Sequence, residues 1–103
     1  MSAEPQYVLS TYARRDLDEI LQYVLEQSGP RRAQHVLDRL EDAFRKLSKS
    51  PALGHRREDL TPRPVKFFSV WSYLVIYDPE SRPLRIVRVF HAARDVESIL
   101  SRE

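Results

Sequence analysis

The spacing of apolar residues predicts a short strand and a long helix at the start of the chain. Residues 6–9 form a brief apolar run, and Ser10 then offers a side-chain oxygen for a helix N-cap. Beyond Ser10, apolar residues recur at i, i+4, i+7 and i+11, which is the spacing of one helical face. Asp16, Asp18 and Glu19 place acid in the early turns, where negative charge complements the helix dipole. The apolar positions are Ala13, Leu17, Ile20 and Val24.

A second helix is predicted directly after the first. Gly29 suits the left-handed residue that ends a helix, and Pro30 suits the first turn of the next one. Because the connection is so short, we expect the two helices to form an antiparallel hairpin, each roughly 25 Å long at about 1.5 Å per residue. The apolar face of the second helix comprises Ala33, Val36, Leu37, Leu40, Ala43, Phe44 and Leu47.

The pattern in the second half is that of strands. After a polar loop at residues 54–64, runs rich in β-branched and aromatic residues are separated by turns at 71–72 and 78–83, which predicts an antiparallel meander. Asp95 can then cap a short helix with an apolar face. The predicted strands cover residues 65–70, 73–77 and 84–90, and the last helix presents Val96, Ile99 and Leu100.

The predicted order β-α-α-β-β-β-α indicates an α+β fold, with the helical hairpin packed on one face of a mainly antiparallel sheet. We expect the first strand to join that sheet as an edge. The hairpin can cover only one face, so we expect the other face to be left to a partner or ligand. Trp71 lies at a turn, and we expect it to fill a corner of the core.

Length and composition suit a single domain over residues 1–103. The chain has no cysteine, which excludes disulfides and thiolate sites, and its three histidines are not at metal-ligand spacing. We therefore expect no metal and no cofactor. The N-terminal residues do not resemble an export signal, and no apolar run approaches the ~20 residues of a membrane span, so we expect a cytoplasmic protein.

The formal charge is +2, and it is unevenly distributed. Residues 1–54 carry eight basic and eight acidic side chains and are neutral, so the excess lies in the second half. Arginine dominates, and its planar guanidinium binds phosphate and carboxylate groups through two hydrogen bonds. A solvated surface is the competing interpretation. The basic residues of the second half include Arg56, Arg57, Arg63, Lys66, Arg82, Arg85, Arg88 and Arg94.

A set of residues spread over nearly the whole chain resembles, in its order and spacing, the pattern of ParE toxins of the ParE/RelE superfamily. No single match is specific, but the combination is, and the predicted element order is similar to the fold of that superfamily. The matching residues are Ser10, Ala13, Asp16, Leu17, Ile20, Tyr23, Leu47, Pro51, Gly54-His55-Arg56-Arg57, Asp59-Leu60, Tyr73–Tyr77 and Val87–Val96.

The resemblance implies the toxin of a type II toxin-antitoxin system. The ParE branch inhibits DNA gyrase by binding, and a ParD-type antitoxin neutralises it in a complex that is a heterotetramer or larger. The alternative is the RelE branch, a ribosome-dependent mRNA endoribonuclease, for which His91, Arg94, Arg63 and Glu58 would be the catalytic candidates. The near-neutral charge favours the first, because binding to ribosomal RNA draws on a larger cationic surface. An orphan toxin fold without activity is a third possibility.

For contact with the target, the resemblance points to the C-terminal region, and Arg94 is the first candidate. His91, Arg56 and Arg57 are the others. Each has a structural alternative: His91 as a partly buried imidazole bonded to a backbone carbonyl, Arg94 as the partner of a carboxylate, and the two loop arginines as solvated charges.

For contact with the antitoxin, the candidates are Tyr12, Leu21, Leu25 and Tyr23, which flank the apolar stripe of the first helix. Most residues so placed belong to the core. If some stay uncovered, they would form an apolar groove suited to an amphipathic helix. The resemblance implies that the antitoxin wraps such a helix, with an extension, around the hairpin and the sheet edge.

Overall fold

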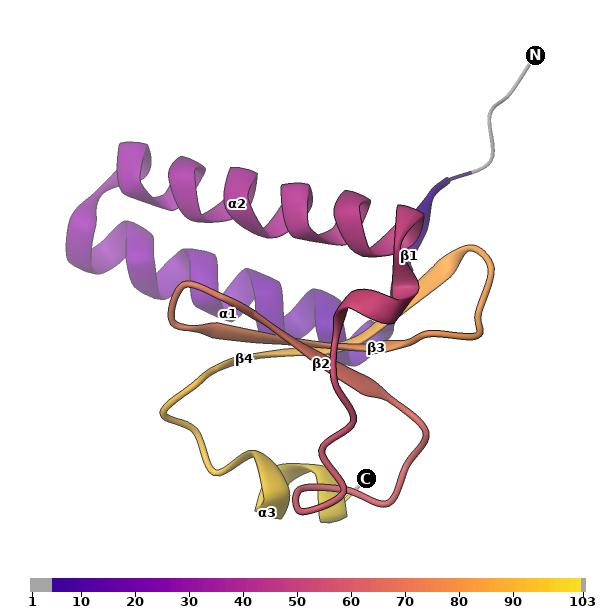
Figure 1. The fold of residues 1–103 in the computed structure, drawn as a ribbon. Helices are drawn as coiled ribbons and strands as arrows, with labels where there is room; N and C mark the ends of the chain where they lie inside the picture. The colour runs from indigo at the N-terminus through magenta and orange to yellow at the C-terminus, as the bar shows by residue number, and fades with distance from the viewer. Residues whose placement is uncertain (1–4, 103) are drawn as a thin grey trace.

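The chain folds in the order predicted from its sequence. The computed structural model describes residues 5–102 of the chain. The helical hairpin lies on one side of a four-stranded sheet, and a short C-terminal helix lies on the other side (Figure 1). The elements are β1 (Tyr7–Leu9), α1 (Thr11–Ser28), α2 (Pro30–Lys49), a 3-10 turn (Pro51–Leu53), β2 (Lys66–Val70), β3 (Tyr73–Asp78), β4 (Leu84–His91) and α3 (Val96–Ser101).

The sheet is mainly antiparallel, as predicted. Its strand order is β1-β4-β3-β2, and β2, β3 and β4 form the antiparallel meander. β1 joins at the edge and runs parallel to β4, with Tyr7 opposite Leu84 and Leu9 opposite Ile86. Because this pairing ends at Ile86, the rest of β4 extends beyond β1 and has no strand on that side.

The hairpin begins and turns at the expected residues. The Ser10 hydroxyl accepts a hydrogen bond from the Ala13 N–H at 3.0 Å and so caps α1. Gly29 has φ of 86°, a left-handed conformation that glycine adopts without steric cost, and it separates the two helices by one residue. Pro30 opens α2, where its missing N–H is not needed.

The main core lies between the hairpin and the sheet, and it contains most of the predicted helical stripes. Ile20 and Leu37 are half-buried at its margin, while the centre of each stripe is fully covered. This core comprises Ala13, Leu17, Val24, Val36, Leu40, Phe44, Leu47, Val75, Tyr77, Leu84, Ile86 and Val89.

The expectation that the second face of the sheet stays open is wrong. Leu60 of the long loop and Ile99 of α3 pack at the margin of a second core on that face. The strands present apolar side chains on both faces, so the loop and α3 are needed to remove the second face from water. This core comprises Val65, Phe67, Ile76, Val87, Phe90, Val96 and Leu100.

A buried ion pair joins α1 to β4. The guanidinium of Arg88 donates to both carboxylate oxygens of Asp16, at 2.7 and 2.9 Å, and the two side chains are only 11% and 8% exposed. The sequence placed Arg88 in the basic surface and Asp16 at the helix dipole, and both assignments are wrong. The first turn of α1 holds no acidic residue. Asp16 faces the sheet instead and neutralises Arg88.

Side chains of α1 also occupy the edge that β1 leaves uncovered. The Ser10 N–H donates to the Ile86 carbonyl at 3.0 Å, and its hydroxyl donates to the Val87 carbonyl at 2.7 Å. Asp16 then accepts from the Val89 N–H at 3.0 Å. Backbone groups of β4 that a longer β1 would have bonded are therefore satisfied by the start of α1, which fixes the helix along this edge.

The Tyr77 hydroxyl ties β3 to the segment that follows α2. It donates to the Pro51 carbonyl at 2.6 Å and accepts from the Gly54 N–H at 2.8 Å. A Cβ at Gly54 would lie 2.6 Å from the Tyr77 hydroxyl oxygen, so only glycine fits there. Burial raises the pKa of the Tyr77 phenol, while the Gly54 N–H lowers it in part.

Trp71 is not in the core, contrary to the expectation. It adopts a left-handed φ of 53° in the β2–β3 turn, and 47% of its surface is exposed. The guanidinium carbons of Arg32 and Arg39 lie 5.1 and 4.9 Å from its ring centroid. The turn projects past the apolar stripe of α2, so the ring rests on the polar side of that helix.

Replacing Asp16 by alanine is expected to destabilise the fold by about 3–5 kcal/mol, because it leaves the buried Arg88 guanidinium without its carboxylate. The double variant Asp16→Leu with Arg88→Met should lose less free energy of unfolding than Asp16→Ala, since it removes both charges together. Urea denaturation measures each value. Asp18→Ala, at an exposed position of the same helix, is the control and should stay within ~0.5 kcal/mol of the parent chain. Equal midpoints for Asp16→Ala and Asp18→Ala would contradict this role.

Tyr77→Phe is expected to lower the free energy of unfolding by about 1–3 kcal/mol at neutral pH, because the Gly54 N–H loses its buried acceptor. The pKa of Tyr77 is raised in the folded state, so above pH ~10 the unfolded chain releases this proton first and the parent chain loses stability. The difference between parent and variant should therefore narrow with rising pH. Denaturation at pH 7 and above pH 10 tests both points. Tyr12→Phe is the control, since the exposed Tyr12 hydroxyl has no hydrogen bond among residues 5–102. If the parent and Tyr77→Phe differed in unfolding free energy by the same amount at both pH values, the pH effect would be contradicted.

Candidate functional site

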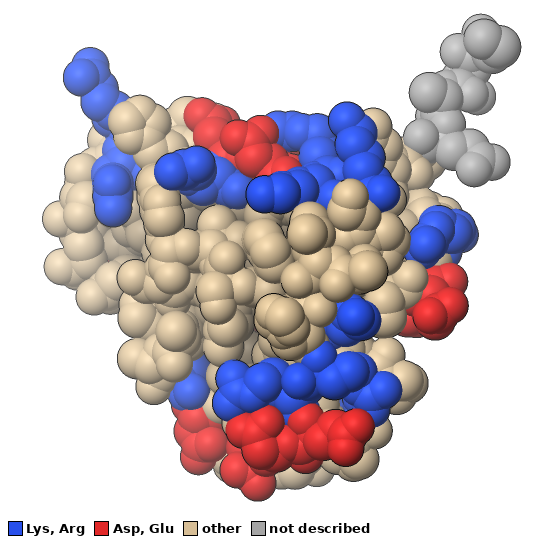
Figure 2. Space-filling view, in the orientation of Figure 1, with Lys and Arg blue, Asp and Glu red and all other residues tan. Residues whose placement is uncertain are grey.

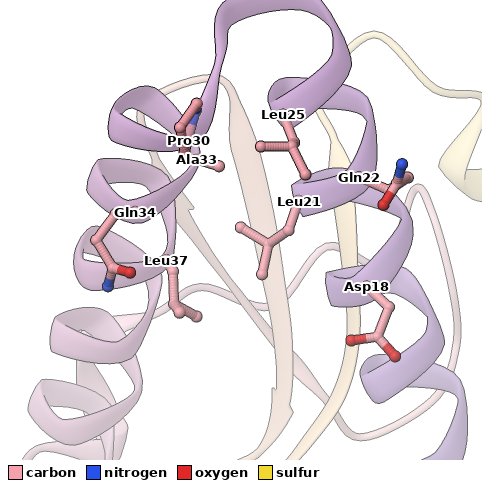
Figure 3. Close-up of a pocket in the computed structure, with 8 residues that line it drawn as sticks. All are labelled: Asp18, Leu21, Gln22, Leu25, Pro30, Ala33, Gln34 and Leu37. Atoms are coloured by element: carbon pink, nitrogen blue, oxygen red, sulfur yellow. The ribbon is translucent and has the colours of Figure 1, made fainter.

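Two grooves flank the second half of α1. The first, which we call the hairpin groove, lies between α1 and α2 and has a volume of about 410 Å³. Leu21 and Leu25 project from α1 toward α2, where Leu37 stands on the facing helix (Figure 3). Polar side chains form the rims. The full lining is Asp18, Leu21, Gln22, Leu25, Pro30, Ala33, Gln34 and Leu37.

The second, which we call the edge groove, lies between α1 and the far end of β4 and has a volume of about 510 Å³. It follows the part of β4 that extends beyond β1. Aromatic, acidic and basic side chains all contribute to it. Its lining is Asp16, Glu19, Ile20, Tyr23, Tyr73, Val89, Phe90, His91 and Arg94.

His91 and Arg94 lie together at one end of the edge groove. His91 is exposed rather than partly buried, and its Nδ1 accepts a hydrogen bond from the Ala93 N–H at 3.1 Å instead of contacting a carbonyl. The neutral imidazole therefore carries its proton on Nε2. The Tyr73 ring packs edge-on against it, with centroids 5.6 Å apart.

Arg94 has no carboxylate partner among residues 5–102, so the predicted ion pair is not formed within them. Its guanidinium carbon lies 5.8 Å from the Phe90 ring centroid in a cation–π contact, and the residue is exposed. Asp95, the next residue, caps α3 as predicted by accepting from the Ser98 N–H at 3.2 Å. The cap fixes the turn from which Arg94 projects.

Arg56 and Arg57 are placed elsewhere, in the loop before β2, and each is paired with an acid. Arg57 binds Asp59 through two hydrogen bonds of 2.9 and 2.8 Å, which lowers the pKa of that carboxyl group. Arg56 lies 3.5 Å from Glu58. Basic and acidic side chains accordingly stand side by side at the bottom of Figure 2. The positive charge of this loop is largely neutralised locally.

The four candidates of the endoribonuclease alternative do not share one groove. His91 and Arg94 line the edge groove, but Glu58 and Arg63 lie in the loop that covers the opposite face of the sheet. Glu58 is engaged with Arg56, and no hydrogen bond or ion pair within the described chain joins it to His91.

The four candidates for antitoxin contact are divided by α1. Leu21 and Leu25 line the hairpin groove, and Tyr23 lines the edge groove on the other side of the helix. Tyr12 is the second residue of α1, and the Arg88 guanidinium carbon lies 5.3 Å from its ring centroid. A partner that contacts all four must cross α1.

The sequence analysis did not name most of the edge-groove residues as site candidates. Among them are Tyr73, which was predicted as part of a strand, and Glu19, which was assigned to the helix dipole. Burial is the main cause that raises the pKa of the Tyr73 phenol. Period-2 alternation within β3 places Tyr73 on the same face as the buried Val75, which is the signal that could have found it. Within residues 5–102 no group of histidines and carboxylates could hold a metal ion.

Comparisons with known proteins agree with this fold. The model of the family described as "ParE toxin of type II toxin-antitoxin system, parDE" matches residues 7–96. Toxin ParE3 of Caulobacter vibrioides is 32% identical over 88 residues, which are 85% of this chain and 87% of that protein. A chain of the structure described as "Chromosomal ParDE TA system from P. aeruginosa" has a TM-score of 0.70 at 18% identity, covering 82% of this chain and 92% of that chain.

The structural likeness, at this low identity, concerns the fold alone. No helix among residues 5–102 combines the length and apolar character of a membrane span.

The family match and the relative each extend over most of the sequence, and they confirm the resemblance seen in the motifs. The chain belongs to the ParE toxin family of the parDE type II toxin-antitoxin systems.

Proposed function

We propose that this toxin inhibits DNA gyrase by binding, without catalysing a reaction, and that a ParD-type antitoxin silences it by covering the same groove. One observation carries the proposal. His91 and Arg94, assigned to toxicity, and Tyr23, assigned to antitoxin contact, line a single edge groove. An antitoxin segment in this groove would bury the residues that we assign to the target.

The edge groove has the composition of a protein-binding site. Arginine and tyrosine dominate the energetics of protein interfaces, and here Arg94 stands beside Tyr23 and Tyr73. The guanidinium of Arg94 can donate to a carboxylate or a backbone carbonyl of the target through two parallel N–H groups. Arg56 and Arg57, which already hold acidic partners, are expected to add less.

The same geometry gives weaker support to catalysis. Cleavage of an RNA phosphodiester needs several cations around the developing phosphorane charge, together with a base and an acid. Arg94 is one such cation in the groove, whereas the nearby strand residue Arg88 is bound to Asp16 and does not line it. The remaining candidates, Arg63 and Glu58, lie outside the groove. We therefore assign the edge groove to binding.

The two grooves together suit an antitoxin that wraps around α1. An amphipathic helix would place apolar side chains between Leu21, Leu25 and Leu37, with its polar side toward the rims of the hairpin groove. An extended segment would then continue across Tyr23 into the edge groove and carry an acidic group to Arg94. Residues 1–103 would act as one toxin domain in the cytoplasm, within a heterotetramer or larger complex.

Arg94→Gln is expected to weaken inhibition of gyrase supercoiling at least about tenfold, because one desolvated charge-assisted contact is lost. Arg102→Gln changes the charge equally at an exposed position outside the groove and should inhibit like the parent chain. Supercoiling assays with purified proteins, and growth after induction without antitoxin, measure the effect. An Arg94→Gln protein as active as the Arg102→Gln control would count against the assignment. A parent protein that leaves supercoiling untouched but cuts mRNA in translating ribosomes would establish the RelE-type alternative.

Leu25→Glu is expected to weaken antitoxin binding about 10- to 100-fold while gyrase inhibition is kept, because it places a charge in the apolar hairpin groove only. Tyr23→Ala should weaken both activities, since Tyr23 lines the shared edge groove. Gln27→Glu adds the same charge to α1 outside both grooves and serves as the control. Titration calorimetry with the antitoxin and supercoiling assays give the two readouts. If Tyr23→Ala affected only one activity, the shared groove would be refuted.

A further inference from the structure

Glu19 lines the edge groove with a carboxylate that the helix itself does not use. An acid stabilises the helix dipole only in the first turn, and Glu19 is exposed in the middle of α1. Among residues 5–102 it makes no hydrogen bond or ion pair, not even with Arg15, which stands one turn earlier on the same helix. The carboxylate is therefore available to a bound partner.

One cation of the edge groove is likewise without an acidic partner. The Asp16 carboxylate binds the Arg88 guanidinium at 2.7 and 2.9 Å, so this acid is already neutralised. Arg94 stacks on Phe90 and has no carboxylate partner within the described chain. The groove thus presents one carboxylate and one guanidinium, each lacking a partner of opposite charge among residues 5–102. They are Glu19 and Arg94.

These two charges lie on opposite sides of the sheet edge. Glu19 belongs to α1, which packs on the main-core face of the sheet (Figure 1). Arg94 stacks on Phe90, a residue of the second core on the opposite face. Val89 of β4 donates its N–H to Asp16, so its backbone groups point toward this edge and not toward β3. The groove therefore straddles the edge of β4, with its acid on one face and its cation on the other.

An extended protein segment along this edge would direct successive side chains to opposite faces of the sheet. A basic side chain on the α1 side would then reach Glu19, while an acidic side chain on the other side reached Arg94. A nucleic acid backbone carries only negative charge, so phosphates beside Arg94 would leave Glu19 facing further phosphates. Contacts between like charges suppress the wrong partner. The two charges therefore favour a protein segment that carries both signs.

We propose that Glu19 determines which partner the edge groove accepts: its carboxylate binds a basic side chain of the antitoxin and disfavours nucleic acid. This inference rests on the proposed function, because it takes an antitoxin segment to occupy the groove. That segment then carries a base and an acid at adjacent positions, or at positions separated by another odd number of residues. The base binds Glu19 and the acid binds Arg94, so the two contacts together fix the face to which each side chain points.

The test variant is Glu19→Lys, and the probes are the full-length antitoxin and a fluorescein-labelled single-stranded RNA of mixed sequence. Antitoxin affinity, measured by titration calorimetry, should fall about tenfold or more, because a like charge then faces the base. RNA affinity, measured by anisotropy at low salt, should rise about threefold or more, and the slope of log K against log salt should steepen by about 0.7 for one added phosphate contact. Glu19→Gln should give smaller changes in the same directions.

The matched control is Glu80→Lys, which makes the same charge change at an exposed position of the β3–β4 turn, outside both grooves. It should bind the antitoxin like the parent chain and gain less RNA affinity than Glu19→Lys. Equal results for the two variants would overturn the proposal, since only net charge would then matter. An unchanged antitoxin affinity of Glu19→Lys would do the same. Circular dichroism checks that each variant is folded.

Tyr23→Ala separates this inference from the proposed function. If Tyr23→Ala bound the antitoxin like the parent chain, no antitoxin segment would occupy the edge groove, and the proposed function would fail together with the role of Glu19. If Tyr23→Ala weakened antitoxin binding and Glu19→Lys did not, only the role of Glu19 would be lost. No gyrase is present in these assays, so their outcome does not depend on the target of the toxin.

Discussion

The ion pair between Asp16 and Arg88 is the contact on which the arrangement of this protein depends. Asp16 binds the guanidinium through both oxygens and also accepts the Val89 N–H. Arg88 in turn stacks on Phe90, 4.4 Å from its centroid, and Phe90 belongs to the second core. One buried cation therefore connects α1, the free edge of β4 and the far side of the sheet. The desolvation cost of such a pair offsets much of its attraction, so its main effect is to fix one register of helix against strand.

That register positions the two grooves beside α1. With α1 held along β4, the edge groove opens beside Tyr23 and His91, while the hairpin groove stays on the other side of the same helix. The edge groove is rich in aromatic and charged groups, and the hairpin groove is mostly apolar. A partner that occupied both would gain an apolar anchor and would also cover Arg94. In this arrangement the antitoxin would silence the toxin by direct competition, with no change of fold required.

The location of charge in the structure differs from its location along the chain. The sequence has its basic excess after residue 54, yet Arg88 is buried there, and Arg56 and Arg57 are neutralised by Glu58 and Asp59. The guanidiniums without acidic partners include Arg32 and Arg39, in the half whose charges sum to zero. The net charge of a segment counts every charged side chain. Binding of an anionic partner depends instead on which arginines are already paired with an acidic residue of the same chain.

What the sequence by itself determined were the elements and the main core. The Ser10 cap, the turn at Gly29 and the helical stripes depend on groups within about four residues of one another, so spacing alone reveals them. The tertiary structure decided which faces were covered and which charges were paired. Asp16 and Arg88 are 72 positions apart, and Trp71 meets Arg32 and Arg39 only after the meander has turned back over α2. Such contacts depend on strand register and on where β1 ends, and neither leaves a periodic signal in the residues themselves.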